Sequence, residues 1–150
     1  MKTEDNKYPD TINTYLPNTS FVSSITYPNG STICYNRDFV TNEITEVSTD
    51  ADGLNNSSIR KYRYGLLTKL KTNNYNIEYE YDEEERISKI KIGDTDYLTN
   101  TYAKNDVTNE QTITTTFNNN KYETVKYDKY NKVINITDSE SNNINFTYNT

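Results

Sequence analysis

The side chains that could carry out acid–base chemistry or bind metal in this sequence are almost all carboxylates. The 150 residues include 22 Asp and Glu, one Cys and no His. Two carboxylates flanking a cleft can hydrolyse a glycosidic bond, and residues 50–53, 82–85 and 94–96 each bring together oxygen ligands of the kind that calcium prefers. Because residues 50–53 lack the further acids and the closing Glu of an EF-hand loop, and because close pairs arise by chance among so many acids, we favour solvated turns for all three groups.

Other catalytic and metal chemistry lacks its ingredients. Without His, Cys34 can belong neither to a Cys–His nucleophile pair nor to a Cys/His zinc site, and we expect it to be an ordinary strand residue. With four Gly in the whole chain, there is no glycine-rich loop to hold phosphate. We therefore expect a protein that is not an enzyme and that needs no cofactor, and keep a carboxylate-dependent hydrolase as the least favoured alternative.

Charge and hydropathy exclude further classes of function. The net charge of -6 leaves no basic footprint for nucleic acid, and no apolar run approaches the length of a membrane span. The first six residues are charged and polar with no apolar stretch after them, so no signal peptide is visible. We expect no nucleic-acid partner and no membrane span.

The elements that must position any site are predicted to be strands. Only 32% of the residues are hydrophobic, yet 15 are Tyr, whose large ring packs while its hydroxyl stays in water. Asn and Thr number 23 each and Ala appears twice, which disfavours helices. The composition favours a polar β protein with a thin core.

An internal repeat organises the sequence. Residues 79–90 read Tyr-x-Tyr-Asp, three turn residues, Arg, Ile, two polar residues and Ile, and residues 125–136 repeat this spacing. Weaker copies begin near residues 33, 62, 100 and 146, and the last is cut off at Thr150. The positions that carry the pattern are Tyr35, Tyr62, Tyr64, Gly65, Tyr79, Tyr81, Asp82, Arg86, Ile87, Tyr102, Tyr127, Asp128, Asn131, Val133 and Tyr148.

Each copy is interpreted as a β-hairpin. Tyr-x-Tyr places both rings on one face of a strand, Asp accepts hydrogen bonds from backbone N–H groups two or three residues on, and Gly or Asn at the fourth position takes a left-handed conformation. The spacing of three between the aliphatic residues, as in Ile87 and Ile90, implies a bulge near the turn. An amphipathic helix over residues 83–92 is the alternative, because Glu, Lys and Arg favour helices.

The hairpins extend over most of the chain. We expect an irregular leader over residues 1–20, followed over 21–150 by an antiparallel array of about five hairpins and a truncated sixth. Strands are expected at 77–81 and 112–117, a turn at 118–121, and the longest loop at 49–58. The fold class is thus all-β, a hairpin array that forms a curved or spiral sheet.

The repeat resembles the YD repeat of the Rhs family, which is found in bacterial Rhs toxins, Tc toxin shells, wall-associated proteins and teneurins. The resemblance covers roughly residues 25–150; residues 79–90 match best, and residues 27–30, Tyr-Pro-Asn-Gly, are similar to a turn found between such repeats. The turn glycine is retained only at Gly65 and replaced by Asn42, Glu85 and Asn131. Because Glu is strained in a left-handed conformation, we expect a different turn at Glu85.

The resemblance implies a noncatalytic structural module, part of a shell or stalk that encloses or presents another polypeptide on a bacterial surface or in a secreted protein. Its implied partners are neighbouring YD repeats or a cargo polypeptide of a longer parent. The family's self-cleavage motif begins with Asp-Pro, which this sequence lacks, so we expect neither autoproteolysis nor an attached toxin domain.

Two further kinds of partner remain open. Exposed tyrosines could stack on sugar rings or contact a receptor, although Tyr in a thin sheet more often serves packing. An open array also has two unpaired edges, so we expect either that residues 1–20 cover an edge or that copies of the chain pair through their edges.

Overall fold

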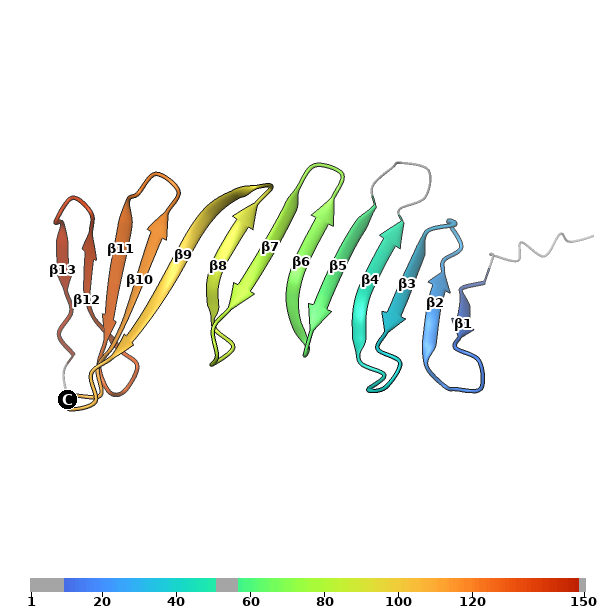
Figure 1. Cartoon of the computed structure of the whole chain (residues 1–150), viewed down its shortest axis with the longest axis horizontal. Helices are drawn as coiled ribbons and strands as arrows, with labels where there is room; N and C mark the ends of the chain where they lie inside the picture. The colour runs from blue at the N-terminus through green and yellow to red at the C-terminus, as the bar shows by residue number, and fades with distance from the viewer. Residues whose placement is uncertain (1–9, 51–56, 149–150) are drawn as a thin grey trace, which may run out of the picture. The chain divides into compact units, whose positions relative to one another are not determined.

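The computed structural model describes residues 10–50 and 57–148, and these residues form strands and turns without any helix. The 13 strands belong to one unclosed sheet and follow one another in sequence order, each beside its neighbour in the chain (Figure 1). This confirms the prediction of an all-β array of antiparallel hairpins. The strands are β1 (Ile12–Tyr15), β2 (Val22–Thr26), β3 (Thr32–Arg37), β4 (Ile44–Asp50), β5 (Ser58–Arg63), β6 (Leu66–Thr72), β7 (Asn76–Tyr81), β8 (Ile87–Ile92), β9 (Thr95–Lys104), β10 (Gln111–Phe117), β11 (Tyr122–Tyr127), β12 (Val133–Asp138) and β13 (Asn143–Asn145).

The chain divides into two compact units, one ending at Ile77 and the other beginning at Glu78, so that the boundary lies inside β7. In the second unit, strand alternation separates apolar from polar side chains. Directly paired residues form an apolar row across β9 to β13, made of Tyr102, Ile113, Val125, Ile136 and Ile144. The adjacent row, made of Thr101, Thr114, Thr124, Thr137 and Asn143, points to the other face. A polar sheet face therefore accounts for part of the large Thr content.

The first unit follows the same rule. Tyr35 pairs with Val47, Val47 with Arg60 and Arg60 with Leu70, so this row is largely apolar. Cys34 lies in the neighbouring row, opposite Ser48, and is an exposed residue of β3. The expectation that this cysteine is an ordinary strand residue is confirmed.

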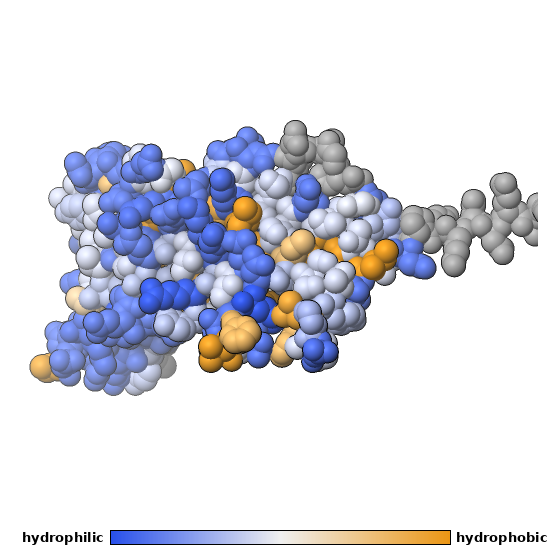
Figure 2. All heavy atoms as spheres, turned by 45° about the vertical axis from the view of Figure 1, so that its right-hand side comes forward, coloured by the Kyte–Doolittle hydropathy of each residue, from blue (hydrophilic) through white to orange (hydrophobic). Residues whose placement is uncertain are grey.

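No hydrophobic side chain within the described ranges is fully buried. In an open sheet, neighbouring side chains on the same face cover one another only in part. Figure 2 accordingly shows hydrophobic patches open at the surface among hydrophilic side chains. The sheet must therefore depend strongly on its turns and on contacts between neighbouring strands.

Two expected irregular segments are shorter than predicted. Residues 12–15 lie inside the expected leader but form β1, which pairs with β2, because Ile12 and Tyr15 supply residues that favour strands. This segment covers one edge of β2 and becomes the edge strand itself. In the expected loop at 49–58, residues 49 and 50 belong to β4 and residue 58 to β5, while residues 51–56, like residues 1–9 of the leader, lie outside the described residues.

Residues 83–92 form a turn followed by β8, so the alternative of an amphipathic helix is wrong. The alternation Ile90, Lys91, Ile92 and the pairing of β8 with β9 outweigh the helix propensity of the glutamates.

Candidate functional site

Five turns share one backbone geometry, and they position the side chains of the repeat. In each five-residue turn, the N–H of the first residue donates to the carbonyl of the fifth, and the N–H of the fourth donates to the carbonyl of the first, at 2.8–3.1 Å. The fourth residue has a positive φ between 61° and 85°. The turns span residues 27–31, 82–86, 117–121, 128–132 and 138–142.

Three of the five turns begin with aspartate, and its side chain stabilises them. Oδ1 of Asp82 accepts hydrogen bonds from the N–H groups of Glu84 at 3.1 Å and Arg86 at 2.9 Å. Asp128 makes the same two bonds, so the acceptor role is confirmed, but the second donor lies four residues on in this turn. Glu85, with φ 62°, adopts the same turn as Asn131, also 62°. The expectation of a different turn at Glu85 is therefore wrong, because the bonds to Asp82 offset the strain.

Two longer turns explain the irregular copies of the repeat. Residues 38–43 and 105–110 each form a six-residue turn in which the carboxylate of Asp38 or the amide oxygen of Asn105 accepts the N–H groups two and three residues on. The residue that stabilises the first of these turns is thus Asp38 and not Asn36, which directly follows Tyr35 as Asp82 follows Tyr81. Tyr35 and Tyr102 consequently lie two residues further from their turns than Tyr81 and Tyr127 do.

Bulges follow several turns, as predicted. Val133 pairs with Tyr127 and Ile136 pairs with Val125, so one residue of β12 is extra between them. The bulge brings the two aliphatic residues onto the face of Val125 and Tyr127 although they are three apart in sequence. The β3–β4 and β5–β6 hairpins have the same kind of register shift, at Ile44 and Leu67.

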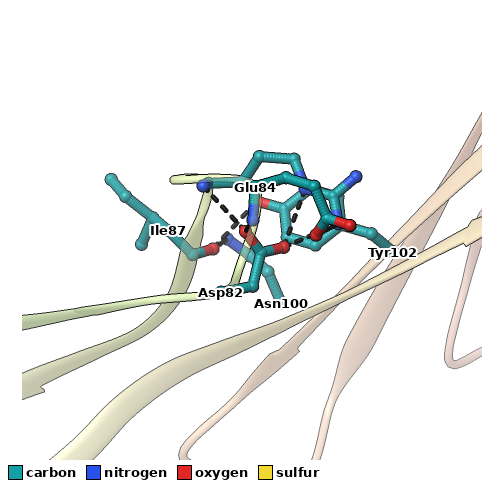
Figure 3. A network of polar contacts seen from close by, with 6 residues as sticks. Asp82, Glu84, Ile87, Asn100 and Tyr102 are labelled. Atoms are coloured by element: carbon teal, nitrogen blue, oxygen red, sulfur yellow. Dashed lines mark hydrogen bonds and ion pairs between the residues drawn. The ribbon is translucent and has the colours of Figure 1, made fainter.

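The turn at Asp82 is joined to the next hairpin by a tyrosine. The hydroxyl of Tyr102 donates to the carbonyl of Ile87 at 2.8 Å, and the amide of Asn100 donates to the same carbonyl at 3.0 Å (Figure 3). The guanidinium of Arg86 lies over the Tyr102 ring at 4.1 Å from its centre. We call this arrangement of a cation over a ring whose hydroxyl binds the following carbonyl the tyrosine tie.

The guanidinium of the tie is itself held by acids. Arg86 Nε donates to Asp82 Oδ2 at 2.7 Å, and Arg86 Nη2 contacts Glu84 at 2.9 Å. The hydrogen bond from the Arg86 side chain is the largest cause that holds the pKa of Asp82 below its ordinary value. Asp82 and Glu84 thus hold the Arg86 guanidinium in the orientation in which it contacts the Tyr102 ring.

A second tyrosine tie occurs one repeat later. The hydroxyl of Tyr148 donates to the carbonyl of Val133 at 2.7 Å, and Lys132 Nζ lies 5.0 Å from the centre of the Tyr148 ring. In both ties the tyrosine follows the accepting residue by fifteen positions. The repeat seen in the sequence is therefore also a repeat of side-chain contacts.

Tyr64 occupies the equivalent position in the first unit without forming a tie. In each tied copy, the second aliphatic residue pairs with a residue of a neighbouring strand, and the tie tyrosine, Tyr102 or Tyr148, lies four residues after that pairing partner. In the first unit, the second aliphatic residue is Val47, its pairing partner is Arg60, and Tyr64 lies four residues after Arg60. Tyr64 and Gly65, however, form the two-residue turn between β5 and β6, with φ values of 51° and 79°. The Tyr64 ring is 76% exposed, and the structure gives its hydroxyl no hydrogen bond to another described residue.

This departure has a physical cause and a cost. The hairpin of β5 and β6 lacks three residues of the repeat, so Tyr64 falls in the turn and not in a strand. A left-handed conformation in a residue as bulky as Tyr costs on the order of 1 kcal/mol, and two-residue turns of this kind favour Asn or Gly.

A groove of about 480 Å³ opens where the tie is absent. Its lining comes from β3, the turn at 38–43, β4, β5 and the β5–β6 turn, and consists of Arg37, Glu43, Ile44, Val47, Tyr62, Tyr64 and Gly65. Arg37 Nη1 donates to the carbonyl of Asn42 at 2.9 Å, and the Arg37 guanidinium lies 5.0 Å from the centre of the Phe21 ring. The carboxylate of Glu43 has no hydrogen bond or ion pair with another described residue.

The predicted repeat positions are distributed along the array and do not meet in one centre. Eight of them lie in strands, namely Tyr35, Tyr62, Tyr79, Tyr81, Ile87, Tyr102, Tyr127 and Val133. Six lie in turns, namely Tyr64, Gly65, Asp82, Arg86, Asp128 and Asn131, and Tyr148 follows β13. The sequence pattern missed Glu43 and Arg37, although the alignment of Glu43 with Arg86 and Lys132, each directly before the first aliphatic residue, would have marked it.

The acidic groups do not form a metal centre in the part of the chain that the structure describes. Nowhere in it do three or more His, Cys, Asp or Glu side chains come together as metal ligands; residues 52 and 53 lie outside it. The described ranges likewise contain no helix of the length and apolarity needed to cross a membrane.

Two comparisons with known proteins found no match. No protein-family model matches the chain, and no curated protein matches it in sequence. The resemblance to YD repeats therefore stays a prediction.

Proposed function

We propose that the chain is a noncatalytic structural module, a YD-like repeat array that forms part of a shell or stalk of a larger Rhs-like surface or toxin protein. In the parent it encloses or presents another polypeptide. The observation that carries this proposal is the recurrence, within the described residues, of one turn five times and of the tyrosine tie twice, in one unclosed sheet.

The arrangement of side chains supports a role in contact with other polypeptide. An apolar row crosses β9 to β13, its last residue Ile144 is 55% exposed, and no hydrophobic side chain in the described ranges is fully buried. Large uncovered apolar surfaces of soluble proteins usually mark contact with another chain. Neighbouring repeats and a cargo polypeptide both suit this face.

Sequencing on both sides of the coding region tests the proposal that the chain is part of a longer repeat array. We expect further in-frame copies of the pattern Tyr-x-Tyr-Asp, three turn residues, cation and aliphatic residue, with spacings of about 20–30 residues. Two flanks that both lack such copies would contradict a place inside a longer array.

Self-association provides a second test. β1 and β13 are the edge strands, and neither contains a charged residue that would oppose pairing with another edge. Size-exclusion chromatography with light scattering should show association that grows with protein concentration. A strict monomer at high concentration would contradict pairing between copies.

A carbohydrate- or receptor-binding module is the second candidate, and one observation favours it. Tyr64, Tyr75 and Tyr130 are 76%, 61% and 69% exposed, and all three lie in turns or connections outside the sheet faces. Exposed rings are suited to stacking on a sugar or a partner. A saturable response to a soluble polysaccharide, reduced by Tyr130→Ala but not by Tyr97→Phe, would support it; an unsaturable or absent response would remove it.

A further inference from the structure

The groove beside Tyr64 differs from the two tied turns in a defined way. Arg86 and Lys132 come directly before the first aliphatic residue and place a cation over the ring of Tyr102 or Tyr148. At the equivalent position the first unit has Glu43, and the equivalent ring is that of Tyr64. Glu43 thus places a negative charge at the position where the turns at 82–86 and 128–132 have a positively charged side chain.

Glu43 and Tyr64 give the groove groups that suit a cation, and Nε of Arg37 in its lining also lacks a hydrogen-bond partner among the described residues. Among the described residues, the Glu43 carboxylate has no donor and the Tyr64 hydroxyl has no acceptor or donor. Ile44 and Val47 give the groove an apolar floor that could cover the methylene stem of a long basic side chain. The net charge of -6 also favours basic partners over acidic ones.

The cations already present leave this site open. Arg63 lies 5.3 Å from the centre of the Tyr64 ring, and because a ring has two faces it covers at most one of them. Arg37 lines the groove, where its Nη1 donates to the Asn42 carbonyl and its guanidinium lies beside the Phe21 ring. Neither arginine forms an ion pair with Glu43.

We propose that this groove binds an arginine or lysine side chain of a partner polypeptide. The basic group pairs with Glu43 and contacts the ring of Tyr64, while its methylene stem lies on Ile44 and Val47. The bound side chain then supplies from outside the cation that Arg86 and Lys132 supply from within. This inference is independent of whether the array belongs to a shell or a stalk.

Chemical shifts of the labelled, full chain test the proposal directly. The probe is acetyl-Gly-Arg-Gly-amide, and its control is the same peptide with uncharged citrulline in place of arginine. We expect saturable shifts of the amides of residues 43–47 and 62–65 with the arginine peptide, and at least about tenfold weaker binding of the citrulline peptide, since a hydrogen bond to a charged group is lost. Binding should weaken as salt is added, because the pair is exposed to solvent.

Matched variants locate the site. Glu43→Gln should weaken binding about tenfold, whereas Glu110→Gln makes the same change in the sister six-residue turn, outside the groove, and should leave binding unchanged. Glu43→Arg should abolish binding, because it restores the chain's own cation beside Tyr64. A dispersed amide spectrum establishes that each variant is folded, and if Glu43→Arg does not fold, the two glutamine variants decide.

Three results would overturn the proposal. The first is the absence of saturable shifts with the arginine peptide. A soluble oligosaccharide that shifts the same amides, while the arginine peptide does not, belongs to this first result. The second is equal binding of the citrulline peptide. The third is equal weakening by Glu43→Gln and Glu110→Gln.

Discussion

The tyrosine tie at Tyr102 should contribute measurable stability through its hydroxyl alone. Tyr102→Phe removes the 2.8 Å hydrogen bond to the Ile87 carbonyl but keeps the ring beneath Arg86. A hydrogen bond contributes a net 0.5–1.5 kcal/mol, or about 1 kcal/mol. The Ile87 carbonyl still accepts from Asn100 at 3.0 Å, so the substitution leaves no unsatisfied acceptor and the loss should not exceed this range.

Urea unfolding followed by far-UV circular dichroism measures the loss. With a slope near 2 kcal/mol per molar urea, about 1 kcal/mol lowers the midpoint by about 0.5 M. Because the strands pair only with neighbours, hydrogen exchange should show that the lost protection is concentrated in β8 and β9.

Tyr97→Phe is the matched control for this loss. Tyr97 also lies in β9, is 45% exposed, and its hydroxyl makes no hydrogen bond with another described residue. Its midpoint should stay at the wild-type value. Equal midpoints for Tyr102→Phe and Tyr97→Phe would refute the claim that the tie stabilises the array.

Three other properties can be measured with the same protein. The pKa of Asp82 in the folded chain is lowered mainly by the Arg86 side chain. The ionised Asp82 therefore contributes fully to the free energy of unfolding above the ordinary Asp pKa of about 4, and this contribution is lost as pH falls through the pKa of the folded chain. The urea midpoint should drop on acidification, and it should drop less steeply in Asp82→Asn. Glu85→Gly relieves the strain at φ 62° and should raise the free energy of unfolding by about 1 kcal/mol, whereas Glu84→Gly, next to it in the turn, should not; a lower midpoint for Glu85→Gly would contradict the strain argument. Cys34 is exposed, so Ellman's reagent should titrate one thiol in native protein as fast as in urea, and a protected thiol would show that its sheet face is covered.

Strand positions and turns could be predicted because they depend on short-range physics. Alternation predicted strands at 77–81 and 112–117, and the structure has them at Asn76–Tyr81 and Gln111–Phe117. The spacing of Val133 and Ile136 predicted the bulge. The role of Asp82 followed from the turn chemistry of aspartate. All of these signals lie within about ten residues of sequence.

The contacts between hairpins could not be predicted in the same way. The tie between Tyr102 and Ile87 joins residues fifteen apart, and it depends on where the intervening turn falls. The placement of Tyr64 in a turn followed from a hairpin three residues shorter than the repeat, and the pattern alone placed this ring in a strand. The six-residue turn at Asp38 likewise lies two residues further from Tyr35 than the repeat spacing predicts.

The sequential order of the strands also determines how the chain can fold. Every strand is followed in the sheet by the next strand of the chain, so each pairing closes a short loop and costs little loop entropy. Such low contact order favours rapid folding for a β protein, and assembly can start at any strong hairpin and spread in both directions. The hairpins with aspartate turns and tyrosine ties are the natural starting points, and the hairpin of Tyr64, which lacks a tie, should be among the last to form and the first to open.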